Sequence, residues 1–193
     1  MKELDFSIKE TDQWKWSPAL GPDVGDMIDL SMEHFKHETA GLLEPDTHRG
    51  AKLLTDAIIG QLYYPTSEFV IVARDRETDK IVAWAWAKRN CMMEFSSEET
   101  TELRVIHIDQ SLPVRHKIGL VGQLAWIWWQ WSKQNGIPVM VAATLRSEQS
   151  AFLRVLESVG FQVRGSYAFI RTDRAPEVVE PEVEEPQIYT GTR

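Results

Sequence analysis

One stretch, residues 102–161, constrains the fold more than any other part of the chain. It begins with an apolar strand pattern (ELRVIHID), passes through a polar loop (QSLPVRHKIG), and continues as a helical pattern (LVGQLAWIWWQWSKQNG) and a second strand pattern (IPVMVAATL). A tight turn can join two antiparallel strands, whereas parallel neighbours need a longer crossover, which is usually a helix. Two strands joined through a helix are therefore expected to lie parallel. The stretch therefore predicts a βαβ unit, followed by a second helix (SEQSAFLRVLESVG) and then Phe161.

The loop that enters the first of these helices is where we expect chemistry. At the start of a helix the backbone N–H groups are unpaired and the helix dipole adds positive charge, so an anion such as a phosphate can bind there. Here Arg115, His116 and Lys117 precede Gly119 and Gly122. One interpretation is an anion site in which the cationic side chains reinforce the N–H groups. The other is that the two glycines allow close packing and the cations lie on the surface.

The segments before this unit predict the elements that flank it. Helical and strand periodicity, read with the turn residues between them, gives their approximate bounds. In chain order we predict a strand at 4–10, a loop at 14–22, helices at 23–37 and 48–63, and an antiparallel hairpin of 69–74 with 80–88. Thr47 is the predicted cap of the second helix. After the unit, residues 162–172 predict one or two short strands.

The composition argues against two classes of partner. The formal net charge of -8 disfavours a general nucleic-acid binder, which needs a basic surface. The amino-terminal residues MKELDFSIKETDQ are too polar for a signal peptide, and no apolar run approaches about 18 residues. Cys91 is the single cysteine, so no intrachain disulfide can form. We therefore expect no nucleic-acid or membrane partner, and a cytoplasmic location: the host cytoplasm, or the virion if a phage encodes the chain.

The composition changes sharply near residue 175. The segment APEVVEPEVEEPQIYTGTR is rich in Glu and Pro and has too few apolar residues to form a core of its own. The sequence therefore predicts one domain over residues 1–174 and an acidic tail over 175–193. The tail is expected either to be solvated or to dock as an arm on a partner.

Four of the eight tryptophans lie in the helical pattern of the βαβ unit, at Trp126, Trp128, Trp129 and Trp131. They point in several directions around the helix, so one sheet cannot cover all of them. Either the amino-terminal helices bury the remainder, or the helix contributes to an interface in an oligomer or a larger assembly.

The order of elements resembles the GCN5-related N-acetyltransferase (GNAT) fold over residues 4–173. That fold is α/β (α+β), with a mixed, centrally splayed sheet flanked by helices on both faces. Three local features are similar to the family's motifs: RHKIGLVG at 115–122, which resembles its Q/R-x-x-G-x-G/A pyrophosphate loop; LRS at 145–147, where the family often has Asn; and LESVGF at 156–161, which resembles its Y-x-x-x-G-F.

The resemblance implies that acetyl-coenzyme A binds between the two strands of the βαβ unit, where residues 104–109 part from residues 139–144. Its diphosphate would bind the N–H groups of residues 119–122. An amine would attack the thioester with the help of a base, and often of a Tyr acid. The implied cofactor-binding residues are Ile108, Arg115, His116, Lys117, Gly119, Leu120, Val121 and Gly122.

The chain departs from the family pattern at three positions. His116 stands where the family has Arg or Gln, and Val121 stands where it has a second small residue, so that Gly122 comes one place late. A Val side chain there would crowd a phosphate unless the loop shifts. Leu156 stands at the usual Tyr position and has no proton to donate.

The candidate catalytic residues are His107, Asp109 and Tyr167. An amine nucleophile must lose a proton, so a carboxylate or an imidazole near the parting strands is needed. Strand alternation puts His107 and Asp109 on one face and Glu102, a further candidate base, on the other. The alternative for His107, Asp109 and Glu102 is that each is a solvent-exposed strand residue. Tyr167 is the candidate acid, and its alternative is a packing role. His34, His37 and Glu38 lack a further ligand cluster, so no metal is expected.

The leading hypothesis is a GNAT-like N-acyltransferase that moves an acetyl group from acetyl-coenzyme A to an unidentified amine. The alternative is a GNAT-fold protein without catalysis that serves as a structural or interaction subunit, for example in a phage particle. A third hypothesis is a module that binds coenzyme A without using it. The departures at Val121 and Leu156 favour the alternatives, and the order of elements favours the enzyme.

Overall fold

The computed structural model describes residues 13–39, 43–90, 96–143 and 150–163. The chain divides into two units at 163/164, and all the described residues belong to the first. The predicted strand at 4–10, the strands at 162–172 for the most part, and the acidic tail lie outside the described residues. The predicted domain boundary at 174/175 lies there too and stays a prediction.

The described core is a five-stranded mixed sheet in the order β1-β2-β3-β4-β5. Its strands are β1 (Trp14–Pro18), β2 (Glu68–Asp75), β3 (Ile81–Asn90), β4 (Thr100–Ile108) and β5 (Val139–Ala142). The first three pairings are antiparallel, and β4 pairs with β5 in parallel. The structure therefore confirms the predicted hairpin of β2 with β3 and the predicted βαβ unit.

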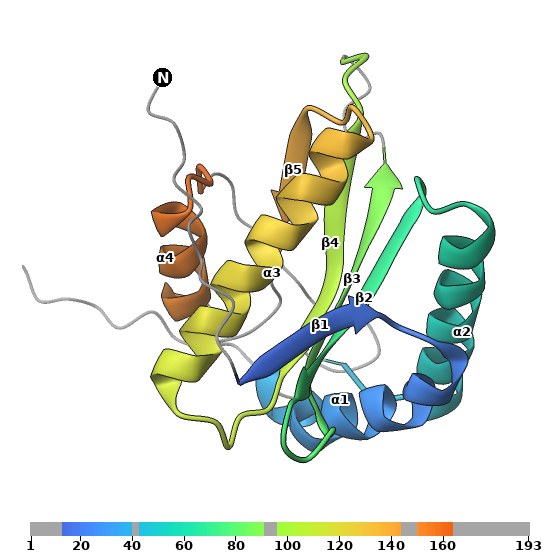
Figure 1. The fold of residues 1–193 in the computed structure, drawn as a ribbon, viewed down its shortest axis with the longest axis vertical. Coiled ribbons are helices and arrows are strands. Elements are labelled where there is room, and N and C mark those ends of the chain that lie inside the picture. The colour runs from blue at the N-terminus through green and yellow to red at the C-terminus, as the bar shows by residue number, and fades with distance from the viewer. Residues whose placement is uncertain (1–12, 40–42, 91–95, 144–149, 164–193) are drawn as a thin grey trace, which may run out of the picture. The chain divides into compact units, whose positions relative to one another are not determined.

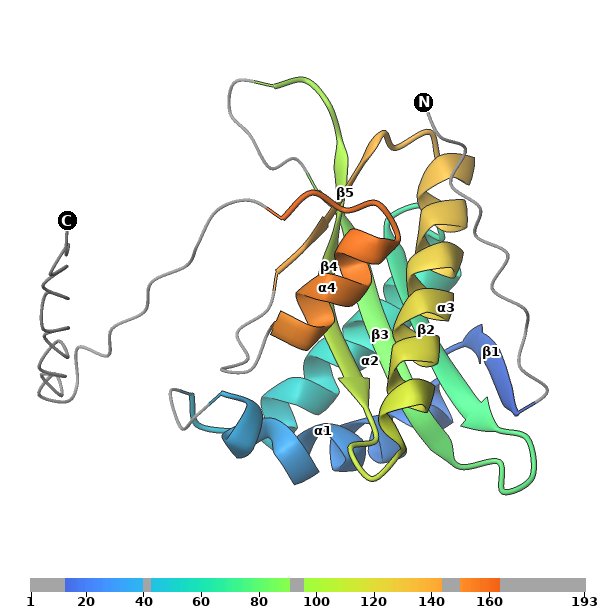
Figure 2. The ribbon, with the colours of Figure 1, turned by 90° about the vertical axis from the view of Figure 1, so that its left-hand side faces the viewer.

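The helices form two layers, one on each face of the sheet (Figures 1 and 2). The 3-10 turn η1 (Gly21–Asp23), α1 (Val24–Glu38) and α2 (Thr47–Tyr63) cover one face, where Met27, Leu54 and Ile58 pack against Val70 and Trp84. The helices α3 (Val114–Gln134) and α4 (Ser150–Ser158) cover the other face. This arrangement confirms the predicted fold class. None of the described helices is both long and apolar enough to span a bilayer.

The segment that we expected to be a loop at 14–22 begins with a strand. Trp14 pairs with Asp75 and Trp16 with Ala73 across β2. Trp14 is buried in the core, and the indole N–H of Trp16 donates to the Gln123 side chain at 2.8 Å. The prediction was wrong because the nearby Pro and Gly residues were taken as turn signals. Pro18 is tolerated because β1 lies at an edge of the described sheet, where a missing N–H costs no ladder hydrogen bond.

The cap of α2 is Asp46 rather than the predicted Thr47. Asp46 has an extended backbone, and its carboxylate accepts a hydrogen bond from the Arg49 N–H at 2.9 Å. Thr47 is already helical, so its side chain is one position too late to act as the N-cap.

A β-bulge at Arg104 changes which face each residue of β4 occupies. The pairing steps from Trp86 with Val105 to Ala87 with Leu103, which leaves Arg104 without a partner position on β3. Leu103 packs with the α3 layer, whereas Val105 packs with the α1 and α2 layer. Alternation is therefore interrupted within the strand, as expected for a bulge.

The bulge corrects the predicted placement of Glu102. Glu102 pairs with Lys88, which lies two residues from Trp86 on β3 and therefore shares its face. Because Trp86 pairs with Val105, the face of Glu102 is also that of Val105 and His107. The prediction of opposite faces counted residues across the bulge as if the strand were regular.

The described parallel pairing of β4 with β5 is short. The pairs run from Thr100 with Val139 to Leu103 with Ala142. From Arg104 to Ile108, β4 continues along β3 but has no described strand on its other side. Residues 144–149, which follow β5 closely, lie outside the described residues, so the splay that the family resemblance implied stays a prediction.

Both helices of the α3 and α4 layer end in the same way. Gly136 (φ 68°) and Gly160 (φ 101°) have left-handed backbones. At each end, the N–H groups of the glycine and of the next residue donate to backbone carbonyls of the last turn. Gly136 and Ile137 donate to Lys133 and Ser132, and Gly160 and Phe161 donate to Glu157 and Leu156. This is the Schellman motif, which explains the Gly-Phe pair at the end of α4.

We predict that Gly160→Ala destabilises the fold by about 1–2 kcal/mol, because a side chain at a left-handed position meets its own backbone. Urea unfolding measures the change in the free energy of unfolding. The control is Gly25→Ala in α1, where no atom lies within 4 Å of the new Cβ and a right-handed helix favours Ala. Equal effects of the two substitutions would contradict the assignment.

Candidate functional site

Residues 115–122, which we expected to form a loop, are the first turns of α3. The helix begins at Val114, after Pro113 at the N-cap. The N–H groups of His116 and Lys117 donate to the Pro113 carbonyl at 2.9 and 3.2 Å. The N–H groups of residues 119–122 therefore lie within the helix, where each donates to the carbonyl four residues earlier. The predicted loop was wrong because two glycines were taken as a turn signal, whereas Pro113 starts the helix.

The N–H groups that a helix start leaves without an intrahelical acceptor are here those of Val114 and Arg115. No side chain caps this end of α3. Arg115 is exposed beside these groups, and the Lys117 ammonium donates to the Gln110 carbonyl at 3.1 Å. An anion that binds here would meet the first turn of the helix and not residues 119–122.

The apolar and glycine members of the predicted cofactor set are buried, apart from the partly exposed Gly119. Ile108, Leu120 and Val121 are buried in one apolar cluster, together with Leu156. Val121 therefore points into the core, where it does not crowd the outer face of the helix. Gly122 is buried as well, and Gly119 has no atom within 4 Å of where a Cβ would stand. Cofactor contact by these residues stays a prediction.

His116 lies at the amino-terminal end of α3 against the first strand. Its ring meets the Trp14 ring edge-on, with 5.6 Å between the ring centroids. Its Nδ1 atom is buried and has no hydrogen-bond partner among the described residues. The imidazole therefore packs inward, unlike the exposed Arg115 next to it.

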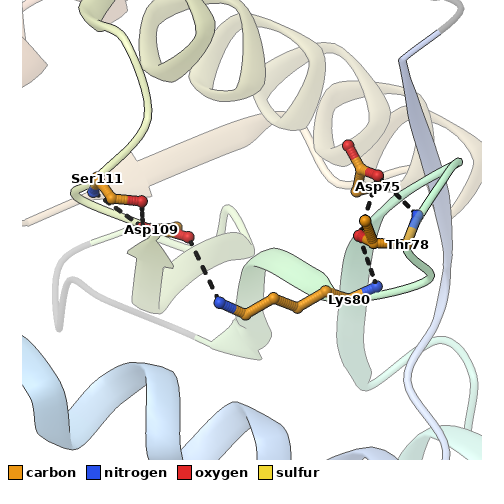
Figure 3. Close-up of polar contacts among 5 residues, drawn as sticks. All are labelled: Asp75, Thr78, Lys80, Asp109 and Ser111. Atoms are coloured by element: carbon orange, nitrogen blue, oxygen red, sulfur yellow. Dashed lines mark hydrogen bonds and ion pairs between the residues drawn. The ribbon is translucent and has the colours of Figure 1, made fainter.

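Asp109 organises the turn between β4 and α3 (Figure 3). Its Oδ1 accepts hydrogen bonds from the Ser111 N–H at 2.8 Å and from the Ser111 hydroxyl at 2.5 Å. Its Oδ2 lies 4.0 Å from the Lys80 ammonium. One oxygen is thus occupied by the turn that leads into α3. A role for Asp109 as a base stays a prediction.

The turn between β2 and β3 lies beside this one, and Lys80 contacts both (Figure 3). The backbone N–H of Lys80 donates to the Thr78 hydroxyl oxygen at 3.4 Å, and this hydroxyl donates to the Asp75 carboxylate at 3.0 Å. Hydrogen bonds from the backbone N–H and then the hydroxyl of Thr78 lower the pKa of the Asp75 carboxyl. The Asp75 bonds therefore persist at neutral pH and are lost only when acid protonates the carboxylate.

His107 lies on the face of β4 that the α1 and α2 layer covers. Its ring centroid is 5.4 Å from that of Trp84. It is half-buried and lines a pocket of about 340 Å³. The pocket lining also contains Ile28, Ser31, Met32, Phe35, Leu43, Glu44, Pro45, Asp46, Arg49, Gly50, Leu53, Leu54, Trp84, Trp86 and Val105.

The pocket is the functional feature that sequence reasoning missed. Its wall comes from α1, α2, β3 and β4, which are far apart in the sequence. The signal that could have found it is the pair Trp84 and Trp86, two large rings with the same strand parity. Of the predicted catalytic residues, His107 lines the pocket, Asp109 lies at the turn after β4, and Tyr167 lies outside the described residues.

The tryptophans of α3 divide between core and partial exposure. Trp128 is 1% exposed and packs against Phe161, whereas Trp126 and Trp129 are half-buried. The indole N–H of Trp131 donates to the Pro65 carbonyl at 3.0 Å. The amino-terminal helices cover the other sheet face, so the prediction that they bury these rings was wrong. A protein interface on this helix stays a prediction.

No family model matches the chain, and no curated protein matches its sequence. Solved structures do match. A "predicted acetyltransferase with acetyl-CoA" from Clostridium acetobutylicum has a TM-score of 0.62 at 11% identity, covering 82% of this chain and 96% of that one. An aminoglycoside antibiotic 6'-N-acetyltransferase from Acinetobacter baumannii has a TM-score of 0.59 at 14% identity, covering 84% and 99%.

Glucosamine-6-phosphate N-acetyltransferase from Arabidopsis thaliana is similar over 84% of this chain and 100% of its own length, with a TM-score of 0.54 at 11% identity. These likenesses show that the chain has the fold that we inferred from the order of its elements. The named acceptors, an aminoglycoside and an amino sugar phosphate, differ from one another. The likenesses therefore do not indicate a particular ligand for this chain.

We predict that Asp109→Ala lowers the free energy of unfolding by about 1–2 kcal/mol, because the turn loses two hydrogen bonds. Asp109→Asn retains an oxygen acceptor for Ser111 and should cost less than about 1 kcal/mol. The exposed Lys80 contributes little through its ion pair. Chemical denaturation of both variants measures the difference. Equal losses in the two variants would show that the charge, and not the turn, is what stabilises the fold.

Proposed function

We propose that this chain, which has the GNAT acetyltransferase fold, transfers an acyl group from acetyl-coenzyme A to an amine. The observation that supports this most is the position of one segment of β4, from Arg104 to Ile108. One edge of the segment has no described strand beside it, and one of its faces lines the pocket through Val105 and His107. A donor along the edge and an acceptor in the pocket would thus meet at the same backbone.

The donor side of the site fits coenzyme A in part. In the proposed complex, the extended, amide-containing pantetheine chain would run along the Arg104–Ile108 segment of β4, as an added strand does. The first turn of α3 offers the N–H groups of Val114 and Arg115 and the Arg115 guanidinium to an anionic group. Residues 119–122 offer no free N–H in this conformation. When bound, acetyl-coenzyme A would supply an activated thioester.

The acceptor side needs a group that removes a proton from the attacking amine. We assign this role to His107, because it is the titratable side chain that the Arg104–Ile108 segment of β4 directs into the pocket. The base takes the proton from nitrogen as the new C–N bond forms, and the thiol leaves with a proton from solvent or an acid. Leu156 cannot be that acid, because it is an alkyl side chain in the core.

We predict that His107→Ala lowers kcat by about 10²–10⁴-fold, the usual contribution of a general base. Release of free thiol from acetyl-coenzyme A with an amine panel measures turnover. The control is His48→Ala, which replaces an exposed His of α2 that does not line the pocket. Unchanged turnover in the His107 variant, with full turnover in the control, would contradict the assignment.

A second candidate function is a binding subunit without catalysis. The start of α3 at Val114 favours it, because it removes the N–H groups of residues 119–122 from reach of a diphosphate. Leu156 at the position of the acid favours it as well. In this candidate the fold and the pocket are retained and the chain binds a partner or a ligand without turning it over. The virion and assembly roles expected from sequence belong to this candidate.

Acetyl-coenzyme A separates the two candidates. A ligand that binds only the folded state at 100 times its Kd stabilises it by about 2.7 kcal/mol, so we predict a rise in Tm when acetyl-coenzyme A is added. Differential scanning fluorimetry with desulfo-coenzyme A as the matched control measures it. No shift at millimolar ligand would reject the transferase. A rise in Tm without turnover of any amine would indicate a protein that binds acetyl-coenzyme A but does not transfer its acetyl group.

A further inference from the structure

We infer that the pocket between α1, α2 and β4 takes a small monoamine with an apolar, aromatic-sized body. This inference rests on the proposed function, because it names the acceptor class of that site. It comes from the chemistry of the pocket wall, the location of its charges and its size. Each of these is a property of this chain's own residues.

The wall is apolar because its two tryptophans present ring carbons and not free donors. The indole N–H of Trp84 donates to the Ser31 hydroxyl at 3.2 Å, and Ser31 donates in turn to the Met27 carbonyl at 2.7 Å. The indole N–H of Trp86 donates to Glu68 at 2.7 Å. Both N–H groups are thus already paired within the protein, which leaves the rings as hydrophobic surface.

The rest of the deep wall is also apolar. Ile28, Met32 and Phe35 from α1 and Val105 from β4 line it. An acceptor with several hydroxyl groups, such as an amino sugar, would lose their hydration against this wall without finding partners. That loss is costly, so such an acceptor is disfavoured. An alkyl or aromatic body gains from the same burial.

The charged groups of the lining are gathered on the segment that connects α1 and α2 and on the first turn of α2. They are the carboxylates of Glu44 and Asp46 and the guanidinium of Arg49. Among the described lining residues, two carboxylates against one guanidinium favour a single ammonium over a carboxylate or a phosphate. The faces of Trp84 and Trp86 favour a cation as well, through their negative ring faces. A second ammonium would have to enter the apolar wall and is therefore disfavoured.

The volume of the pocket suits a small ligand. At about 340 Å³ it lies near the lower end of the range for small-molecule sites, roughly 300–1,000 Å³. One aromatic ring with a short alkylamine chain suits this volume. His107 belongs to the same lining and comes from β4.

The test is equilibrium binding to the full chain without any donor, measured by isothermal titration calorimetry. The probes are 2-phenylethylamine, glucosamine and spermidine. We expect 2-phenylethylamine to bind at least tenfold more tightly than either of the others. Leu53→Arg should weaken its binding at least tenfold, because it places a cation at the pocket. Leu53 is 39% exposed, so the substitution is compatible with folding.

The matched control is Leu62→Arg, on the same helix but outside the pocket lining, which should leave binding unchanged. Tighter binding of glucosamine or spermidine, or no binding of 2-phenylethylamine, would overturn the inference. So would equal losses in the two variants. None of these results bears on donor binding, which the response of Tm to acetyl-coenzyme A tests separately. The transferase proposal is therefore tested by the Tm response and by turnover, independently of this binding measurement.

Discussion

The bulge at Arg104 is the local feature on which the arrangement of the site depends. It rotates the strand so that Leu103 packs under α3 while Val105 and His107 face α1 and α2. The last described pair of β4 with β5, Leu103 with Ala142, directly precedes the same residue. One extra residue therefore changes the face of everything that follows it on β4 and directs an imidazole into a pocket.

The two ends of the proposed site match the expectations from the fold resemblance to different degrees. At the donor end, the described parallel pairing of β4 with β5 stops at Leu103 with Ala142, next to the segment along which pantetheine is proposed to bind. The diphosphate end is altered, because Pro113 starts α3 early and the helix contains the residues expected in the loop. The anchoring of this helix start by Asp109 and Lys80 indicates a well-defined turn. Binding of acetyl-coenzyme A and transfer of its acetyl group therefore have to be tested separately in this chain.

The α1 and α2 layer has two roles in this structure. It buries one face of the sheet through residues such as Met27 and Ile58, and it leaves a pocket where Phe35 and Leu53 meet the strand tryptophans. Ser31 links the two roles, since its hydroxyl pairs with Trp84 and so makes the ring an apolar wall. The chemistry of the pocket is therefore a consequence of how buried polar groups are paired.

The sequence by itself determined the elements and their order: the hairpin, the βαβ unit and both long amino-terminal helices follow from periodicities that any local window contains. It also offered His107 as a candidate base, a role that stays a prediction. Tertiary structure alone decided that Trp14–Pro18 is a strand, that His107 and Glu102 share a face, and that α1 and α2 enclose a pocket. The reason is physical. A bulge is defined by pairing with another strand, and a pocket by packing between distant segments, and neither leaves a periodic trace in the chain.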